Sequence, residues 1–247
     1  MDVSCITDKG KYRKNNEDAF LNLKDNHVFA VADGVGGQNA GEIASKIAVR
    51  SLAMSVEKET PPKGDHHSVA SFFRRAYWKA NMSILNFASN DDTKAGMATT
   101  LVCAYVDKNY VYIFNTGDSR AYLWREGRLG QITKDHTYVY ELLRGGYITE
   151  EEARNHKDGH VITQALGVQD FNYPDYFLIE VKADDVILLS SDGLHGELSN
   201  SKISRLIQED DDAEKINHKL LDAALEAGGR DNITIISIKM TEEDFHE

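Results

Sequence analysis

The chain has 247 residues, 41% of them hydrophobic, and a formal net charge of −12. This length and apolar content allow a sizeable folded core and exclude a largely disordered chain. The acidic balance argues against a nucleic-acid partner, because phosphate backbones are bound by basic surfaces. The sequence shows no N-terminal signal pattern and no apolar run long enough to span a bilayer, so we expect a cytoplasmic protein with no membrane partner.

The first part of the chain alternates short apolar runs with two helical patterns. Short strands are predicted at residues 3–7 and 19–23, around a polar segment, and a continuous apolar strand follows at 28–32. Apolar residues at helical spacing predict helices over residues 42–57 and 68–88. The stretch between these helices contains two prolines and a glycine, which predict a loop.

The second part begins with strands and ends with helices. The predicted strands are 98–106, 110–116, 121–125, 176–181, 186–190 and 233–240. The polar segment 137–170 is predicted to be helical in pieces, and two helices are predicted over 199–208 and 213–227. Strands dominate, with two helices early and two late, which favours stacked sheets covered by helices on both sides.

Three aspartates lie at the ends of apolar strands. Asp33 and Asp192 each follow such a strand and precede a glycine, and Asp231 lies just before the last strand. A carboxylate at the mouth of a buried strand is costly unless a positive group meets it. Because hard divalent cations prefer oxygen ligands, the three aspartates predict one shared cation site.

Two further acids and one arginine are candidates for the same site. Asp18 and Asp118 also lie at predicted strand edges. For any single aspartate a turn is the commoner explanation, because Asp-Gly and Gly-Asp pairs are ordinary turn signals, and it is the five acids together that favour a cation site. Arg13 could bind a phosphate with two parallel hydrogen bonds. A surface ion pair of Arg13 with Glu17 or Asp18 is an equal alternative at this point.

Seven short motifs, in this order, cover nearly the whole chain and resemble one family. The chain is similar to the metal-dependent protein phosphatases of the 2C type, the PPM family, in their compact bacterial form. The motifs are GKYRKNNED (10–18), VADGVGG (31–37), GMATTLV (96–102), NTGDSRA (115–121), ITQALG (162–167), LSSDGL (189–194) and GRDNIT (229–234).

The resemblance implies an α+β fold, a four-layer α-β-β-α sandwich with two central antiparallel sheets flanked by helix pairs. It implies one catalytic domain over residues 1–247, with a flap at about 137–170. The implied activity is hydrolysis of phosphoserine and phosphothreonine in proteins by a metal-activated water at a binuclear Mn²⁺ or Mg²⁺ centre. Phosphorylated proteins and a cognate Ser/Thr kinase are the implied partners, and a monomer is expected.

The resemblance also implies roles for individual residues. Asp33 would bridge two ions and Gly34 would offer its carbonyl oxygen, while Asp192 and Asp231 would hold the second ion. Arg13 would bind the substrate phosphate. The remaining implied positions are Glu17 and Asp18, through water or directly, and Asp118, which would share a third ion with Asp192.

The chain departs from the family pattern at two places. Val35 and Gln38 stand where many members have a histidine that could protonate the leaving group, and Gly159-His160 replaces an Arg-Asn pair. Two other hypotheses stay open from the sequence. One is a phosphoprotein-binding pseudophosphatase, and the other is a structural module in which the acids serve only to hold a cation.

Overall fold

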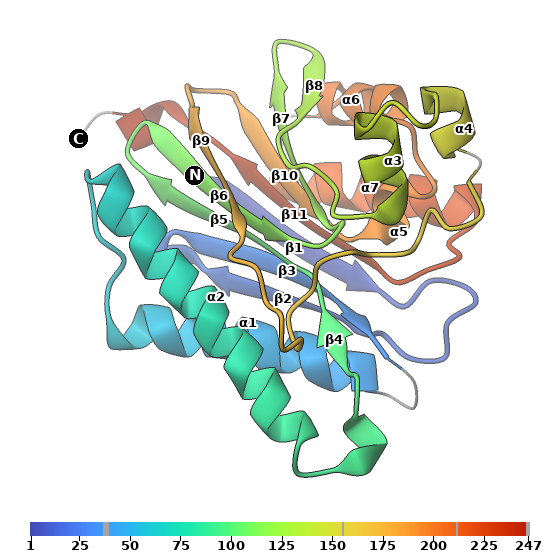
Figure 1. Ribbon diagram of the computed structural model, residues 1–247. Helices are drawn as coiled ribbons and strands as arrows, with labels where there is room; N and C mark the ends of the chain where they lie inside the picture. The colour runs from blue at the N-terminus through green and yellow to red at the C-terminus, as the bar shows by residue number, and fades with distance from the viewer. Residues whose placement is uncertain (37–39, 155, 211, 246–247) are drawn as a thin grey trace.

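A computed structural model describes residues 1–36, 40–154, 156–210 and 212–245 (Figure 1). Its first sheet has five strands, and every neighbouring pair is antiparallel. In spatial order the strands are β1 (Asp2–Asp8), β11 (Ile233–Lys239), β10 (Val186–Ser190), β7 (Arg120–Arg125) and β8 (Arg128–Gln131). The first and last strands of the chain therefore pair with each other.

The second sheet is also antiparallel throughout. In spatial order its strands are β2 (Asp18–Leu23), β3 (Val28–Val35), β5 (Leu101–Asp107), β6 (Tyr110–Thr116) and β9 (Asp175–Glu180). A short strand, β4 (Ala98–Thr99), pairs with the end of β3. The prediction of one strand over residues 98–106 is wrong in one respect, because two strands, β4 and β5, are separated at Thr100. The N–H of Thr100 donates to the Asp33 carbonyl oxygen at 2.9 Å.

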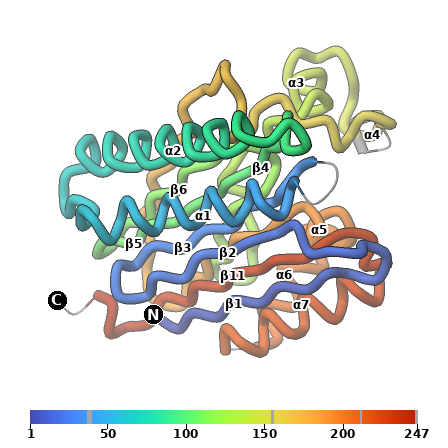
Figure 2. Tube along the Cα trace, turned by 90° about the horizontal axis from the view of Figure 1, so that it is seen from below, coloured from blue at the N-terminus to red at the C-terminus, as the bar shows by residue number. Residues whose placement is uncertain are grey.

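Two pairs of helices cover the outer faces of the sheets (Figure 2). On one side lie α1 (Ala40–Lys58) and α2 (His66–Ala88), and on the other α6 (Asn200–Gln208) and α7 (Ala213–Ala227). The remaining helices are α3 (Tyr138–Arg144), α4 (Glu150–Arg154), α5 (Asp192–His195), and the 3-10 turns Lys24–Asn26, Asp92–Lys94 and Glu242–Phe245. The predicted four-layer α-β-β-α sandwich is confirmed.

Three buried clusters fill the spaces between these four layers. Strand β3 shows how one strand serves two of them. Val28, Ala30 and Ala32 pack with α1 and α2, whereas Phe29 and Val31 pack against residues of the other sheet. Successive side chains of a strand point to opposite faces, so a strand buried on both faces is apolar without alternation. This explains the continuous apolar run at residues 28–32.

Capping residues begin several helices where the sequence places Asp, Ser or Thr. Asp65 accepts hydrogen bonds from the backbone N–H groups of His67 and Ser68, so α2 begins two residues earlier than predicted. Ser199 and Asp212 cap α6 and α7 in the same way. Strand β8 and the short helix α5, of four residues each, were not predicted from the sequence. Among the described residues no helix is long and apolar enough to cross a membrane.

Candidate metal centre

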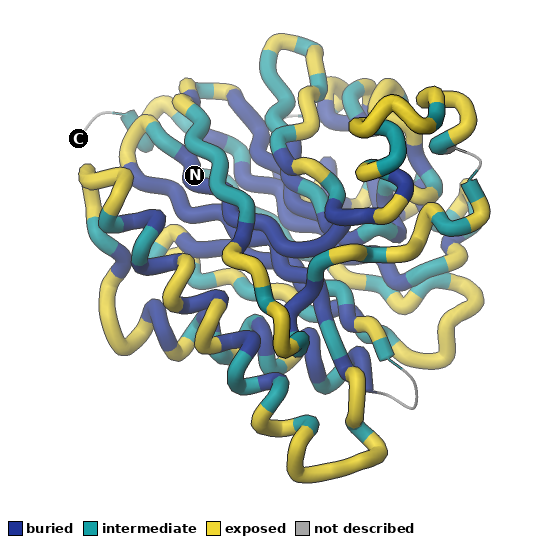
Figure 3. Tube along the Cα trace, viewed as in Figure 1, coloured by how far each residue is buried: buried dark blue, intermediate teal, exposed yellow. Residues whose placement is uncertain are grey.

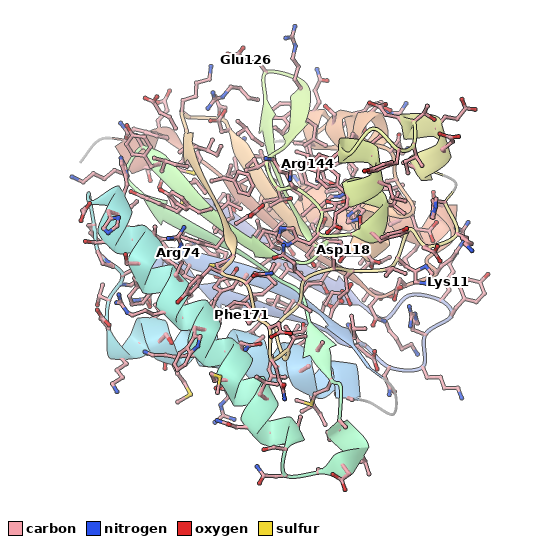
Figure 4. The ribbon with its side chains drawn as sticks, viewed as in Figure 1. Lys11, Arg74, Asp118, Glu126, Arg144 and Phe171 are labelled. Carbon is pink, nitrogen blue, oxygen red and sulfur yellow. The ribbon has the colours of Figure 1, made fainter. Side chains whose placement is uncertain are left out.

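The five candidate aspartates come from different elements and meet at one end of the sandwich. Asp18 and Asp33 are register partners across β2 and β3. Asp192 begins α5 two residues after the end of β10, Asp231 precedes β11, and Asp118 lies in the turn between β6 and β7. Figure 4 shows Asp118 near the middle of the molecule, where strand ends of the two sheets come together. The charges of the other four aspartates all act on Asp33, so the group is one electrostatic cluster.

Burial and mutual repulsion raise the pKa values of four of these carboxyl groups. Desolvation raises the pKa of Asp18 and of Asp118 to about 7, and neighbouring aspartates add to both shifts. The pKa of Asp33 is raised well above its usual value for the same reasons, and that of Asp192 is also raised by burial and by Asp231. The fold therefore gathers acids that cannot all be ionised without a compensating positive charge.

Two buried carboxylate oxygens have no hydrogen-bond partner within the described part of the chain, Asp18 Oδ1 and Asp192 Oδ1. The other oxygen of Asp18 accepts a hydrogen bond from Ser191 Oγ at 2.7 Å. Buried polar atoms are nearly always paired in proteins, so orphaned anionic oxygens indicate an absent partner. A hard divalent cation is the partner that such oxygens bind best, and the donor set therefore fits Mn²⁺ or Mg²⁺.

The described side chains do not by themselves form a finished coordination sphere. No group of three His, Cys, Asp or Glu residues within the described ranges is arranged to hold an ion. The Arg13 guanidinium lies against Asp231, and its charge also acts on Asp192. It therefore offsets part of the negative charge of the cluster.

Arg13 lies on the loop between β1 and β2, and its side chain is 53% exposed. One guanidinium nitrogen donates to Asp231 Oδ2 at 2.5 Å. The alternative ion pair with Glu17 or Asp18 is therefore not the one formed, although the charge of Arg13 does act on Glu17. Because Asp231 is separated from Arg13 by 218 positions, only the tertiary structure brings the two together.

Gly34 is required by the close approach of α1. A Cβ atom on Gly34 would lie 2.1 Å from the Gly41 carbonyl oxygen, and one on Gly41 would lie 2.7 Å from Glu17 Oε2. Ser45 of the same helix donates from Oγ to the Glu17 carbonyl at 2.6 Å. The start of α1 therefore packs directly on the segment that carries Glu17 and Asp18, and the role of Gly41 in this contact was not predicted from the sequence.

Asn232 is a residue whose role the sequence analysis missed. Its Oδ1 accepts from the backbone N–H of Glu17 at 2.7 Å, and its Nδ2 donates to the carbonyl oxygens of Lys9 and Asn15 at 2.8 and 3.0 Å. Asn232 thus fixes the β1–β2 loop beside Asp231. Its place in the motif GRDNIT was the available signal, because the amide of Asn can pair with both donors and acceptors.

The positions expected to differ from the family are only partly described. Val35 ends β3 and is 45% exposed, and Gln38 lies outside the described residues.

Beside the acids lies a polar pocket of about 870 Å³. Residues on its wall include Asp118, Asp192, His195 and, from the segment 137–170, His160.

The segment 137–170, which the family resemblance leads us to expect as a flap, runs past this pocket and carries α3 and α4. Figure 3 shows α4 mostly exposed and α3 as a mixture of exposed and partly buried residues, in contrast to the strands beneath them. Its base is attached to the sandwich, because Thr163 N–H donates to the His136 carbonyl at 2.8 Å and Leu166 N–H donates to the Thr99 carbonyl at 2.8 Å. This segment therefore lies beside the pocket that Asp118 and Asp192 also line.

Comparisons with known proteins agree with this geometry. The family model "Protein phosphatase 2C" matches residues 11–220. The serine/threonine phosphatase stp of Listeria welshimeri is 35% identical over 242 residues, which are 97% of this chain and 96% of that protein.

Two solved structures are also similar to the chain. The serine/threonine phosphatase PstP/Ppp of Mycobacterium tuberculosis has a TM-score of 0.89 at 34% identity, over 97% of this chain and 98% of that one. The catalytic domain of PstP in complex with two manganese ions has a TM-score of 0.86 at 34% identity, over the same shares of the two chains. Family model, relatives, fold and acidic site agree, and the chain belongs to the protein phosphatase 2C family.

Proposed function

We infer that this chain is a metal-dependent serine/threonine protein phosphatase that hydrolyses phosphate monoesters of phosphorylated proteins. The observation that carries this inference is the buried acidic cluster with two orphaned carboxylate oxygens, next to an exposed arginine. Relatives named serine/threonine phosphatases and a neighbour solved with two manganese ions support it. When bound, Mn²⁺ or Mg²⁺ would supply positive charge to the phosphate oxygens and lower the pKa of a water molecule.

We propose ligand roles for the acids as follows. Asp33 would contact two ions, as the family resemblance implies, and its position opposite Asp18 within the buried cluster supports this. Asp192 and Asp231 would hold the second ion, and Asp118 would share a third with Asp192, whose charge also raises the pKa of Asp118. The other proposed ligands are the Gly34 carbonyl oxygen and, through water or directly, Asp18 and Glu17.

Arg13 is proposed to bind the substrate phosphate. A guanidinium has five N–H donors, so it can keep one hydrogen bond to Asp231 while its free edge binds two phosphate oxygens. The half-exposed side chain leaves that edge accessible. Asp231 would then have two functions, as a ligand and as the group that orients Arg13.

The cysteines do not support a mechanism with a covalent thiol intermediate. Burial raises the pKa of Cys5 to about 11, and it raises the pKa of the fully buried Cys103 further. Nucleophilic cysteines need a lowered pKa and access to the substrate. The chain therefore favours direct attack by water on phosphorus over attack by a cysteine thiolate.

We propose that residues 1–247 act as one catalytic domain and as a monomer, with 137–170 as the flap beside the substrate. The cytoplasm is the proposed location, and the two free cysteines support it, because disulfides are rare in reducing compartments. A cognate Ser/Thr kinase, or its substrates, is the proposed partner, because a phosphoprotein substrate requires an enzyme that phosphorylates it.

The test is phosphate release from matched phosphoserine, phosphothreonine and phosphotyrosine peptides, with Mn²⁺ and with a chelator. We expect turnover of the first two peptides only with metal, and little turnover of phosphotyrosine. Absence of metal-dependent turnover on all three peptides, by protein that folds and binds Mn²⁺, would favour the pseudophosphatase instead.

A further inference from the structure

The β1–β2 loop carries a run of positive charge beside the acidic cluster. Residues 9–14 read KGKYRK, in a chain with a net charge of −12. Lys9, Lys11 and Lys14, which we name the lysine rim, are all exposed. Arg13 pairs with Asp231, but within the described ranges no lysine of the rim forms an ion pair with a carboxylate. The rim therefore presents three positive charges that the protein itself does not neutralise.

The loop that carries the rim is held against the segment of Asp231. The Lys11 N–H donates to the Gly229 carbonyl at 2.8 Å, and the Lys9 carbonyl accepts from Asn232 Nδ2 at 2.8 Å. Gly10 has φ of +74°, and a Cβ there would lie 2.2 Å from the Asp231 carbonyl oxygen. Only glycine fits so close an approach in this conformation. The loop that carries the rim is thus held in a defined position relative to Asp231 of the candidate metal centre.

We propose that the lysine rim is a substrate subsite that binds anionic groups flanking the phosphorylated residue. The anion would be an aspartate or glutamate side chain, or a second phosphate group. This proposal rests on the proposed function, because it takes the substrate phosphate to lie against Arg13. It adds a substrate class, namely phosphoproteins whose phosphorylation sites are acidic or multiply phosphorylated.

The spacing along the two chains supports this assignment. Lys14 and Lys11 are one and two positions from Arg13, so their Cα atoms lie within about 4 to 8 Å of the Arg13 Cα. In an extended peptide, a side chain two or three positions from the phosphorylated residue lies about 7 to 11 Å away from it. The rim lysines are therefore within reach of groups at these positions, and a flexible ammonium group can adapt to carboxylate or phosphate.

The charge distribution of the protein explains how the lysine rim could assist substrate binding. An acidic protein with a cluster of buried carboxylates repels a phosphorylated, acidic substrate at long range. Positive charge at the edge of the site reverses that repulsion locally and raises the rate of encounter. Because the rim would not contact the transferred phosphate, its contribution should appear in KM rather than in kcat. From the usual strength of exposed ion pairs, two lysines should change KM roughly three- to tenfold.

The test compares phosphothreonine peptides that differ only at flanking positions two and three residues away. One has neutral residues there, one has aspartates, and one has a second phosphoserine. The test variant is Lys11→Ala/Lys14→Ala, and Lys11→Arg/Lys14→Arg keeps the charge. The matched control is Lys63→Ala/Lys79→Ala, which removes the same charge from an exposed loop and from α2. Both kinetic constants are measured with Mn²⁺ at low and high salt.

We expect wild type to favour the anionic peptides roughly three- to tenfold through KM, and the preference to weaken at high salt. The alanine pair should lose the preference, while the arginine pair and the control should keep it. A preference for the doubly phosphorylated peptide alone would identify phosphate as the anion. Equal KM values in wild type, or equal loss in the control pair, would overturn the proposal.

Failure of the proposed function would look different, because no peptide would be turned over. Calorimetric measurement of the binding of the same three peptides would then test whether the lysine rim binds anionic groups. Tighter binding of the anionic peptides by wild type, lost in the alanine pair, would support it. Equal binding of all three peptides would overturn it.

Discussion

Removing one charge from the acidic cluster should stabilise the metal-free protein, and Asp118→Asn is the sharpest test. The pKa of Asp118 is raised to about 7 in the fold, chiefly by burial and then by Asp192. Its ordinary value is 3.8, and each pKa unit corresponds to about 1.4 kcal/mol. Ionised Asp118 therefore costs the folded state up to about 4 kcal/mol, and the isosteric asparagine does not carry that cost.

The sign of the pH dependence follows from linkage. Below about pH 4 the carboxyl group is protonated in both states, and substitution changes the free energy of unfolding little. Between about pH 4 and 7 the folded state retains a proton that the unfolded state has lost, so wild-type stability falls as pH rises. The stability advantage of Asp118→Asn should therefore grow from pH 4 to pH 8 and reach about 1 to 4 kcal/mol at pH 8. The range extends below the full 4 kcal/mol because the raised pKa of Asp118 depends partly on Asp192.

The assay is urea unfolding in the presence of a chelator at pH 5 and pH 8, followed by tryptophan fluorescence. At pH 8 the melting temperature should also rise by roughly 3 to 12 °C. The matched control is Asp222→Asn, which removes an exposed aspartate from α7 and should change stability at neither pH. Equal stability of wild type and Asp118→Asn at pH 8, or an advantage that is undiminished at pH 5, would refute the electrostatic reasoning.

Chelation of divalent metal should abolish phosphate release and added Mn²⁺ should restore it; undiminished turnover in the chelated sample would contradict the proposed metal dependence. Asp33→Asn should lower kcat roughly 100-fold or more with an unchanged circular dichroism spectrum, and an active variant would remove Asp33 from the ligand set. Arg13→Ala should raise KM for a phosphopeptide roughly tenfold or more while calorimetry shows Mn²⁺ affinity retained; unchanged kinetics would leave Arg13 as a surface ion pair. Asp118→Ala should reduce the rate on a phosphothreonine peptide more than on an aryl phosphate, whose leaving group needs little protonation, and equal losses would exclude a role at the leaving group.

The order of strands and helices could be read from the sequence because burial leaves a periodic pattern. The apolar run at residues 28–32 and the helical spacing in residues 42–57 and 68–88 are local signals, and the structure has elements at all three places. Two short elements were not predicted. Strand β8 and helix α5 have four residues each, which is too few for a period to be recognised.

The candidate site could be predicted only as a set of residue types at the ends of strands. The acids at Asp33, Asp192 and Asp231 indicated a cation because carboxylates in that position are otherwise costly. Their convergence depends on the pairing of strands far apart in the chain, and so does the choice of Asp231 as the partner of Arg13.

What the sequence alone determined was therefore the periodicity of the elements and the positions of the acids, since both are local properties of the chain. What only the tertiary structure decided was contact across long separations. The Asn232 amide donates to a carbonyl oxygen of the β1–β2 loop, more than 200 positions away in the sequence. Gly41 has no side chain and so leaves room for the Glu17 carboxylate. The break at Thr100 likewise depends on its bond to Asp33. No local pattern encodes these contacts, because each requires two segments that meet only after the sheets have paired.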